Sequence, residues 1–79
     1  MAWRVVEVDD RLWNVTLAAE RRAPHDHWQL VLAFRRAEGG ASSVWAEYPL
    51  SASSRSALLI EAERIPNDRL AAVLSDLLA

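Results

Sequence analysis

The stretch that decides the fold is WQLVLAFR, residues 28–35. Its even-numbered positions are all apolar: Trp28, Leu30, Leu32 and Phe34. The odd-numbered positions between them, from Gln29 to Arg35, are mixed in character. A period of two sends alternate side chains to opposite faces of a β-strand. We therefore expect a strand whose even-numbered side chains enter the core.

Three other stretches share this strand character: residues 3–8 (WRVVEV), 12–19 (LWNVTLAA) and 43–48 (SVWAEY). They are separated by turn signals, the pair Asp9-Asp10 and the pair Gly39-Gly40, which suit tight connections between antiparallel strands. Proline lacks a backbone donor, so we expect Pro49 to stop the fourth strand. The first half of the chain therefore predicts a four-stranded antiparallel meander.

After residue 50 the apolar period lengthens to that of a helix. Leu58, Ala62 and Ile65 follow the hydroxyl-rich stretch 51–56, whose serines can cap a helix start, and residues 69–78 repeat leucine and valine at helical spacing. An alternative makes ALLIEA, residues 57–62, a fifth strand. The expected fold is α+β, a single domain over residues 1–79 with four strands and two C-terminal helices packed on one face (ββββαα).

The expected core joins the inward side chains of the second and third strands to the two helices. It comprises Trp13, Val15, Leu17, Trp28, Leu30, Leu32 and Phe34, with Leu58, Leu70, Val73, Leu74 and Leu77.

Length and composition favour a small domain that needs further burial. A chain of 79 residues buries only about 60% of its unfolded surface, yet this one is 52% apolar and holds four tryptophans. A homodimer is a common way to supply the missing burial. The chain has no cysteine, no recognisable signal peptide and no apolar run of about 20 residues, so we expect a cytoplasmic protein.

The residues that could carry catalysis are few and scattered. Both histidines, His25 and His27, lie beside Pro24 in an expected loop, and no further histidine or cysteine completes the three or four ligands that a zinc site requires. The chain has no Gly-x-Ser-x-Gly motif and no phosphate-binding glycine loop. We predict a non-enzymatic protein without catalytic residues, metal or cofactor.

The second sheet face is the expected site of function. Its residues are neither charged nor strongly polar, and such a face tends to be covered. We expect a second copy of the chain, or another protein, to cover it, so that charge-reversing Val31→Glu would prevent association without unfolding. The strand parity of Trp3 and Trp45 stays open. The candidate partner-binding residues are Trp3, Val5, Thr16, Val31, Ala33 and Trp45, with Ile60 on the unburied side of the first helix.

Single-stranded nucleic acid is the alternative occupant of that sheet. The order of four strands followed by a helix is similar to that of the single-stranded DNA-binding coactivator and whirly proteins, which dimerise and use the sheet, a likeness of element order alone. Bases would stack on tryptophans while arginines contact phosphates. The residues concerned are Trp3, Arg4, Arg11, Arg35, Arg36 and Trp45. The net charge of −2 offers no general attraction for nucleic acid, so we favour protein binding.

Overall fold

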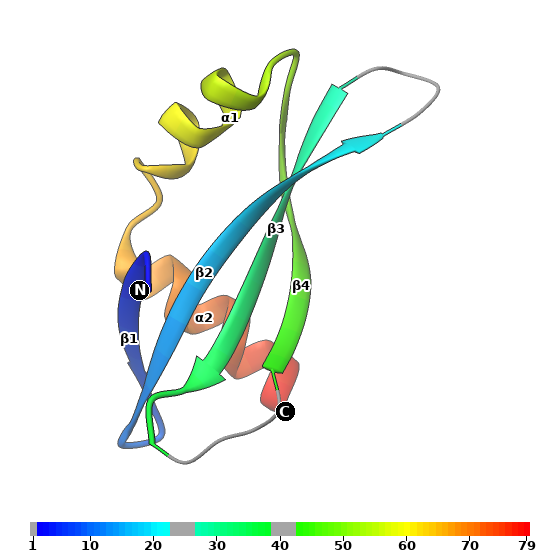
Figure 1. Ribbon diagram of the computed structural model, residues 1–79. Coiled ribbons are helices and arrows are strands. Elements are labelled where there is room, and N and C mark those ends of the chain that lie inside the picture. The colour runs from blue at the N-terminus through cyan, green and yellow to red at the C-terminus, as the bar shows by residue number, and fades with distance from the viewer. Residues whose placement is uncertain (1, 23–26, 39–42) are drawn as a thin grey trace.

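The structure, a computed structural model, describes residues 2–22, 27–38 and 43–79. Four antiparallel strands form one sheet in the order β1-β2-β3-β4, and two helices lie across one of its faces (Figure 1). This confirms the predicted ββββαα arrangement, and it makes residues 57–62 part of a helix. The elements are β1 (Arg4–Val8), β2 (Arg11–Arg22), β3 (His27–Arg36), β4 (Ser43–Ala52), α1 (Arg55–Ala62) and α2 (Asn67–Leu78).

The turn between β1 and β2 is built from two aspartates in the left-handed region. Asp9 and Asp10 have φ angles of 54° and 61°, and Val8 pairs with Arg11 across them. Positive φ at both central residues is the signature of a type I′ hairpin turn, whose twist matches that of the strands. Aspartate adopts this conformation more readily than most residues. The two-residue turn therefore fixes the register of β1 on β2.

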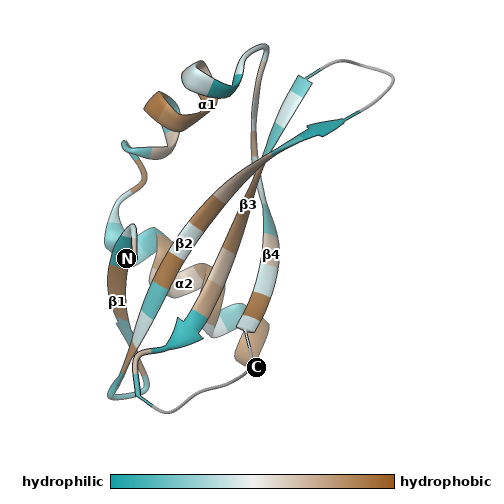
Figure 2. Ribbon diagram, in the orientation of Figure 1, coloured by the Kyte–Doolittle hydropathy of each residue, from teal (hydrophilic) through white to brown (hydrophobic). Residues whose placement is uncertain are grey.

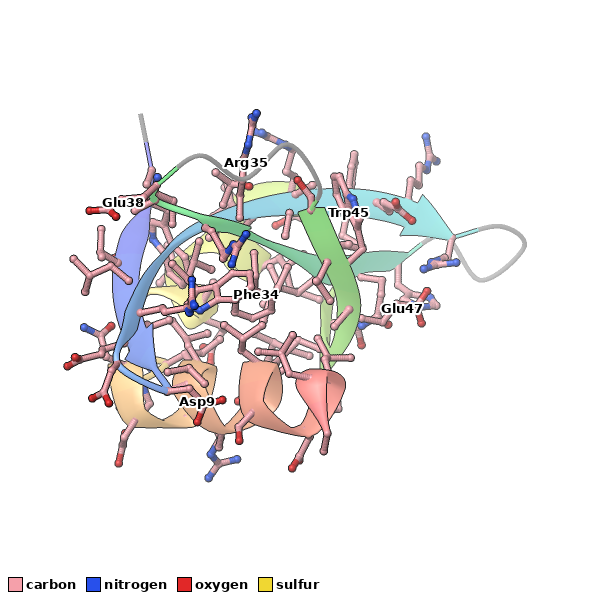
Figure 3. The ribbon with its side chains drawn as sticks, turned by 90° about the horizontal axis from the view of Figure 1, so that it is seen from below. Asp9, Phe34, Arg35, Glu38, Trp45 and Glu47 are labelled. Carbon is pink, nitrogen blue, oxygen red and sulfur yellow. The ribbon has the colours of Figure 1, made fainter. Side chains whose placement is uncertain are left out.

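The core lies between the sheet and the two helices. Figure 2 shows hydrophobic residues along β2 and β3. Alternating residues of these strands belong to the core, and Phe34 points from β3 toward the helices in Figure 3. The helices contribute their buried stripes. The buried core cluster comprises Val6, Val8, Trp13, Val15, Leu30, Leu32, Phe34, Leu58, Ala62, Ile65, Leu70 and Leu74.

Four residues of the expected core are less buried than predicted. Leu17, Trp28 and Val73 are half-buried and pack against the cluster, whereas Leu77 is exposed. Leu77 belongs to the last turn of α2, which crosses behind the sheet from β1 toward β4 (Figure 1). The buried stripe of that helix consists of Leu70 and Leu74.

The fourth strand is longer than expected, because Pro49 does not stop it. Gln29 pairs with Ser51 and Val31 with Glu47, so three residues of β4, numbers 48–50, lie opposite Leu30 in a bulge. The side-chain amide of Gln29 donates hydrogen bonds to the carbonyl oxygens of the first and last of these residues, the latter at 3.2 Å. Proline is tolerated there because β4 is an edge strand and the bulge already interrupts the ladder.

Arg4 ties the first strand to the connection between the two helices. Its guanidinium donates to the backbone carbonyl oxygens of Ile65 and Glu63, the latter at 2.8 Å, and to Asn67 Oδ1 at 3.0 Å. The guanidinium carbon also lies 4.4 Å from the ring centre of Trp3, whose indole N–H donates to Glu63 Oε1 at 3.0 Å. Charge-assisted bonds of this kind are stronger than neutral ones. The cluster holds β1 against residues about sixty positions away in the chain.

The described helices do not resemble membrane spans. In the described part of the chain no helix combines the length and the hydropathy needed to cross a bilayer.

Arg4→Ala tests this tie between β1 and the helices. The substitution removes three hydrogen bonds of a side chain that is only 19% exposed, so we expect the free energy of unfolding to fall by about 2 kcal/mol. Urea denaturation followed by far-UV circular dichroism measures the change. Arg55→Ala, at an exposed arginine in the first turn of α1, should change stability by less than about 0.5 kcal/mol. Equal effects of the two substitutions would contradict the role given to Arg4.

Candidate interaction surface

The helices cover only one face of the sheet, and the opposite face is the candidate surface. In Figure 3 Arg35 and Trp45 lie on the side of the sheet away from the helices, whereas Phe34 lies between the sheet and the helices. Strand alternation assigns the neighbours of these residues. We name this surface the outer face, and it consists of Val5, Glu7, Leu12, Asn14, Thr16, Ala18, Glu20, Arg22, His27, Gln29, Val31, Ala33, Arg35, Ser43, Trp45, Glu47 and Ser51.

The centre of the outer face is recessed, and Trp45 stands beside it. The register aligns Thr16, Ala33 and Trp45 in one row across β2, β3 and β4. Ala33 is buried and Val31 is only 6% exposed, although no helix covers this side, whereas Trp45 is 62% exposed. Ala33 thus lies below the level of Thr16 and Trp45, the larger side chains on either side of it.

A hollow of about 290 Å³, open to solvent, lies on the outer face. Ala33 lies at its centre in the strand register, and Trp45 and Arg35 belong to its wall. The remaining lining residues are Ala2, Asn14, Thr16 and Ser43. A projecting aromatic side chain and a hollow are therefore neighbours on the same surface.

The outer face is charged, contrary to the expectation from the sequence, and its charges are mixed in sign. Arg22 forms ion pairs with Glu20, at 3.3 Å, and with Glu47 across the sheet. With Arg35 and Glu7 included, the face carries two positive and three negative side chains, a sum of −1. It therefore lacks the basic excess that attracts a phosphate backbone.

The predicted partner-binding residues divide into three groups. Val5, Thr16 and Trp45 lie on the outer face and are exposed, which settles the open parity of Trp45. Val31 and Ala33 lie on the same face but are buried. Two others lie elsewhere. Trp3 packs against the core cluster beside Arg4, on the helix side, and Ile60, which is 61% exposed, projects from α1.

The residues of the nucleic-acid alternative are not gathered on one face. Arg35 and Trp45 share the outer face, but the side chain of Arg4 is engaged at the helix connection beside Trp3. The remaining two, Arg11 and Arg36, line hollows at the end of the sheet that carries the β1–β2 turn. The structure thus divides the six predicted contacts into three separate pairs, of which only Arg35 and Trp45 lie on the outer face.

Sequence reasoning missed Leu12 as a surface residue. It is an exposed large apolar side chain on the outer face, opposite Glu7. The signal was present, because Trp13 was expected to face the core and alternation turns its neighbour outward.

The histidine segment lies largely outside the described residues. His27 begins β3, whereas His25 and Asp26 belong to the range 23–26 that is not described. Within the described ranges no three metal-binding side chains come close enough to hold an ion. The expectation that these histidines have no metal-binding role stays a prediction.

Comparison with models of known protein families, with curated proteins and with solved structures found no match to this chain. Its function therefore has to be inferred from the geometry of its surfaces.

The burial of Val31 changes what a charge at this position is expected to do. Instead of preventing association alone, Val31→Glu would place an unpaired carboxylate at a site that is only 6% exposed, and we expect a loss of roughly 3–5 kcal/mol in the free energy of unfolding. Ser56→Glu, at an exposed position of α1 and away from the outer face, adds the same charge and should have little effect. Urea denaturation of both variants measures this difference. A wild-type unfolding midpoint for Val31→Glu would contradict the burial.

Proposed function

We propose that the protein is a non-enzymatic interaction module that acts as a homodimer, with the outer faces of two copies packed against each other. The observation that carries this proposal is the occurrence of the exposed Trp45 and the 290 Å³ hollow side by side on one surface. A two-fold axis brings the same patch of both subunits together, so a projection must meet a recess of that same patch. Trp45 of each copy then fills the hollow of the other.

The size of the outer face supports this arrangement. With strands about 4.8 Å apart and about 3.3 Å per residue, a sheet with five residues in β1 and 10 to 12 in each other strand has an area on the order of 600 Å² in flat projection. Side-chain relief increases this area. A standard stable interface buries about 800 Å² on each partner, about 15% of the 5306 Å² accessible surface of the described chain. The face is therefore comparable in area with one side of a standard dimer interface, and tryptophan is among the residues that most often dominate such interfaces.

The charges of the outer face favour a second copy over nucleic acid. Two-fold symmetry can place the arginines of one copy against the glutamates of the other, because both signs are present on the face. A single strand of nucleic acid carries negative charge only, and it would meet a face whose charges sum to −1.

Trp45→Arg is the direct test, and Ile60→Arg is its matched control. The two residues are 62% and 61% exposed, but they lie on the outer face and on α1 respectively, so the same charge is introduced at equal exposure on different surfaces. Sedimentation equilibrium over a wide concentration range measures the dimer dissociation constant. We expect a wild-type dimer, a rise of about thirty-fold or more for Trp45→Arg, and no change for Ile60→Arg.

Three outcomes contradict the proposal. If the wild-type protein is monomeric at all concentrations, it does not form the proposed dimer. If the Trp45→Arg variant remains dimeric, the outer face is not the dimer interface. Dissociation by Ile60→Arg alone moves the interface to α1. If the monomer also shows quenching of tryptophan fluorescence by oligothymidylate that weakens with salt, nucleic acid replaces the second copy as the ligand.

A further inference from the structure

A second hollow, of about 430 Å³, lies on the other side of the sheet, at the end that carries the β1–β2 turn. It is bounded by strand ends and by the last turn of α2, at the bottom of Figure 1. Val8, Val44 and Leu78 give it an apolar wall, and Arg11 and Arg36 are also part of its lining. A hollow of this volume falls within the range of small-molecule sites, about 300–1,000 Å³.

The two arginines come from adjacent strands and converge on this hollow. Arg36 of β3 pairs with Trp13 of β2, and Arg11 precedes Trp13 by two residues, so alternation places all three on the same side of the sheet. Both arginines also line a neighbouring hollow of about 260 Å³. Among the described residues neither guanidinium has a hydrogen bond or an ion pair. Two charged donors are therefore available at the same place.

The indole of Trp13 adds a third donor without an acceptor. Trp13 lines the larger hollow and is only 7% exposed, and its Nε1 is buried with no hydrogen-bond partner in the described part of the chain. Buried N–H groups are nearly always paired in native proteins. The Nε1 atom is shielded from solvent behind the wall of the hollow, and no described residue accepts a hydrogen bond from it. A ligand in the hollow would first meet the two guanidiniums, which are unpaired among the described residues.

We propose that this hollow binds the carboxylate of a small organic monoanion whose apolar body lies against the aliphatic wall. The charged side chains of its lining are Arg11, Arg36 and Asp9, which sum to +1. Asp10 and Glu38 line the neighbouring hollow beside the same two arginines, so a singly charged ligand meets less repulsion here than a doubly charged phosphate. The planar guanidinium fork pairs well with a carboxylate. The indole N–H of Trp13 is a neutral donor behind the wall, close enough for its NMR signal to report a ligand bound in the hollow. The site is independent of the proposed dimer, since the outer face lies on the opposite side of the sheet.

The indole N–H signals in a ¹⁵N-resolved NMR spectrum provide the test. The chain has four tryptophans, so each gives one indole signal, and the signal lost in Trp13→Phe identifies that of Trp13. Hexanoate is the probe, hexan-1-ol supplies the same apolar body without the charge, and inorganic phosphate supplies an oxyanion without the body. We expect hexanoate to shift the Trp13 signal downfield and to saturate, with a weaker response to each of the other two.

Arginine variants connect the signal to the site. Arg36→Gln and Arg11→Gln should each weaken hexanoate binding about tenfold, since each removes a charge-assisted pair. Arg55→Gln, on α1 at the other end of the molecule, should leave it unchanged (Figure 1). Trp45→Arg should also bind hexanoate normally, which separates this proposal from that of the dimer.

The proposal is overturned if the Trp13 signal does not saturate with hexanoate by about 10 mM. It is equally overturned if hexan-1-ol or phosphate binds as tightly as hexanoate, because the hollow would then select either the apolar body or the charge alone. If hexanoate binds Arg11→Gln, Arg36→Gln and Arg55→Gln with the same affinity, Arg11 and Arg36 do not contact the ligand.

Discussion

Burial of β3 on both faces is the constraint on which the rest of the structure depends. Residues 30–34 are all buried, yet the helices cover only one side of the sheet. On that side Leu30, Leu32 and Phe34 form the centre of the core. On the other side Val31 and Ala33 are short enough to be covered by side chains of the flanking strands. The core and the recessed outer face therefore have a common origin, namely large inward and small outward side chains on one central strand.

Alternation in the sequence predicts the direction of these side chains but not their depth. The period of two in residues 12–19 and 28–35 was sufficient to assign both faces of the two long strands. Depth depends on which neighbour lies across the sheet, and the register that places Trp45 beside Ala33 is not visible in either strand alone. Trp3 shows the same limit at a strand end, because its position is determined by Arg4 and by Glu63, sixty residues away.

Sequence signals within a few residues predict the two helices correctly but not the length of the fourth strand. The difference is whether the stabilising partner is local in the sequence. Ser54 caps α1 by accepting a hydrogen bond from the backbone N–H of Ala57 at 3.1 Å, an interaction contained within four residues and readable from sequence. Beyond Pro49, by contrast, β4 is supported by the side-chain amide of Gln29 on another strand, which bonds to carbonyl groups 19 and 21 residues away. The expectation that proline ends a strand considers only the strand itself, so it could not include the hydrogen bonds from Gln29.

The unpaired indole N–H of Trp13 is costly relative to the total stability of a small domain. An unsatisfied buried donor costs about 1–3 kcal/mol, and native domains are stable by only about 5–15 kcal/mol in total. A chain of only 79 residues buries a smaller fraction of its surface on folding than a larger domain does. The cost of the unpaired indole is therefore a substantial fraction of its stability. The same fold provides the hydrogen bonds of Arg4 with the helix connection and those of Gln29 with the bulge. In the described core the indole is thus an exception to otherwise good pairing, and a ligand bound to the two arginines of the adjacent hollow would add ligand-dependent stability.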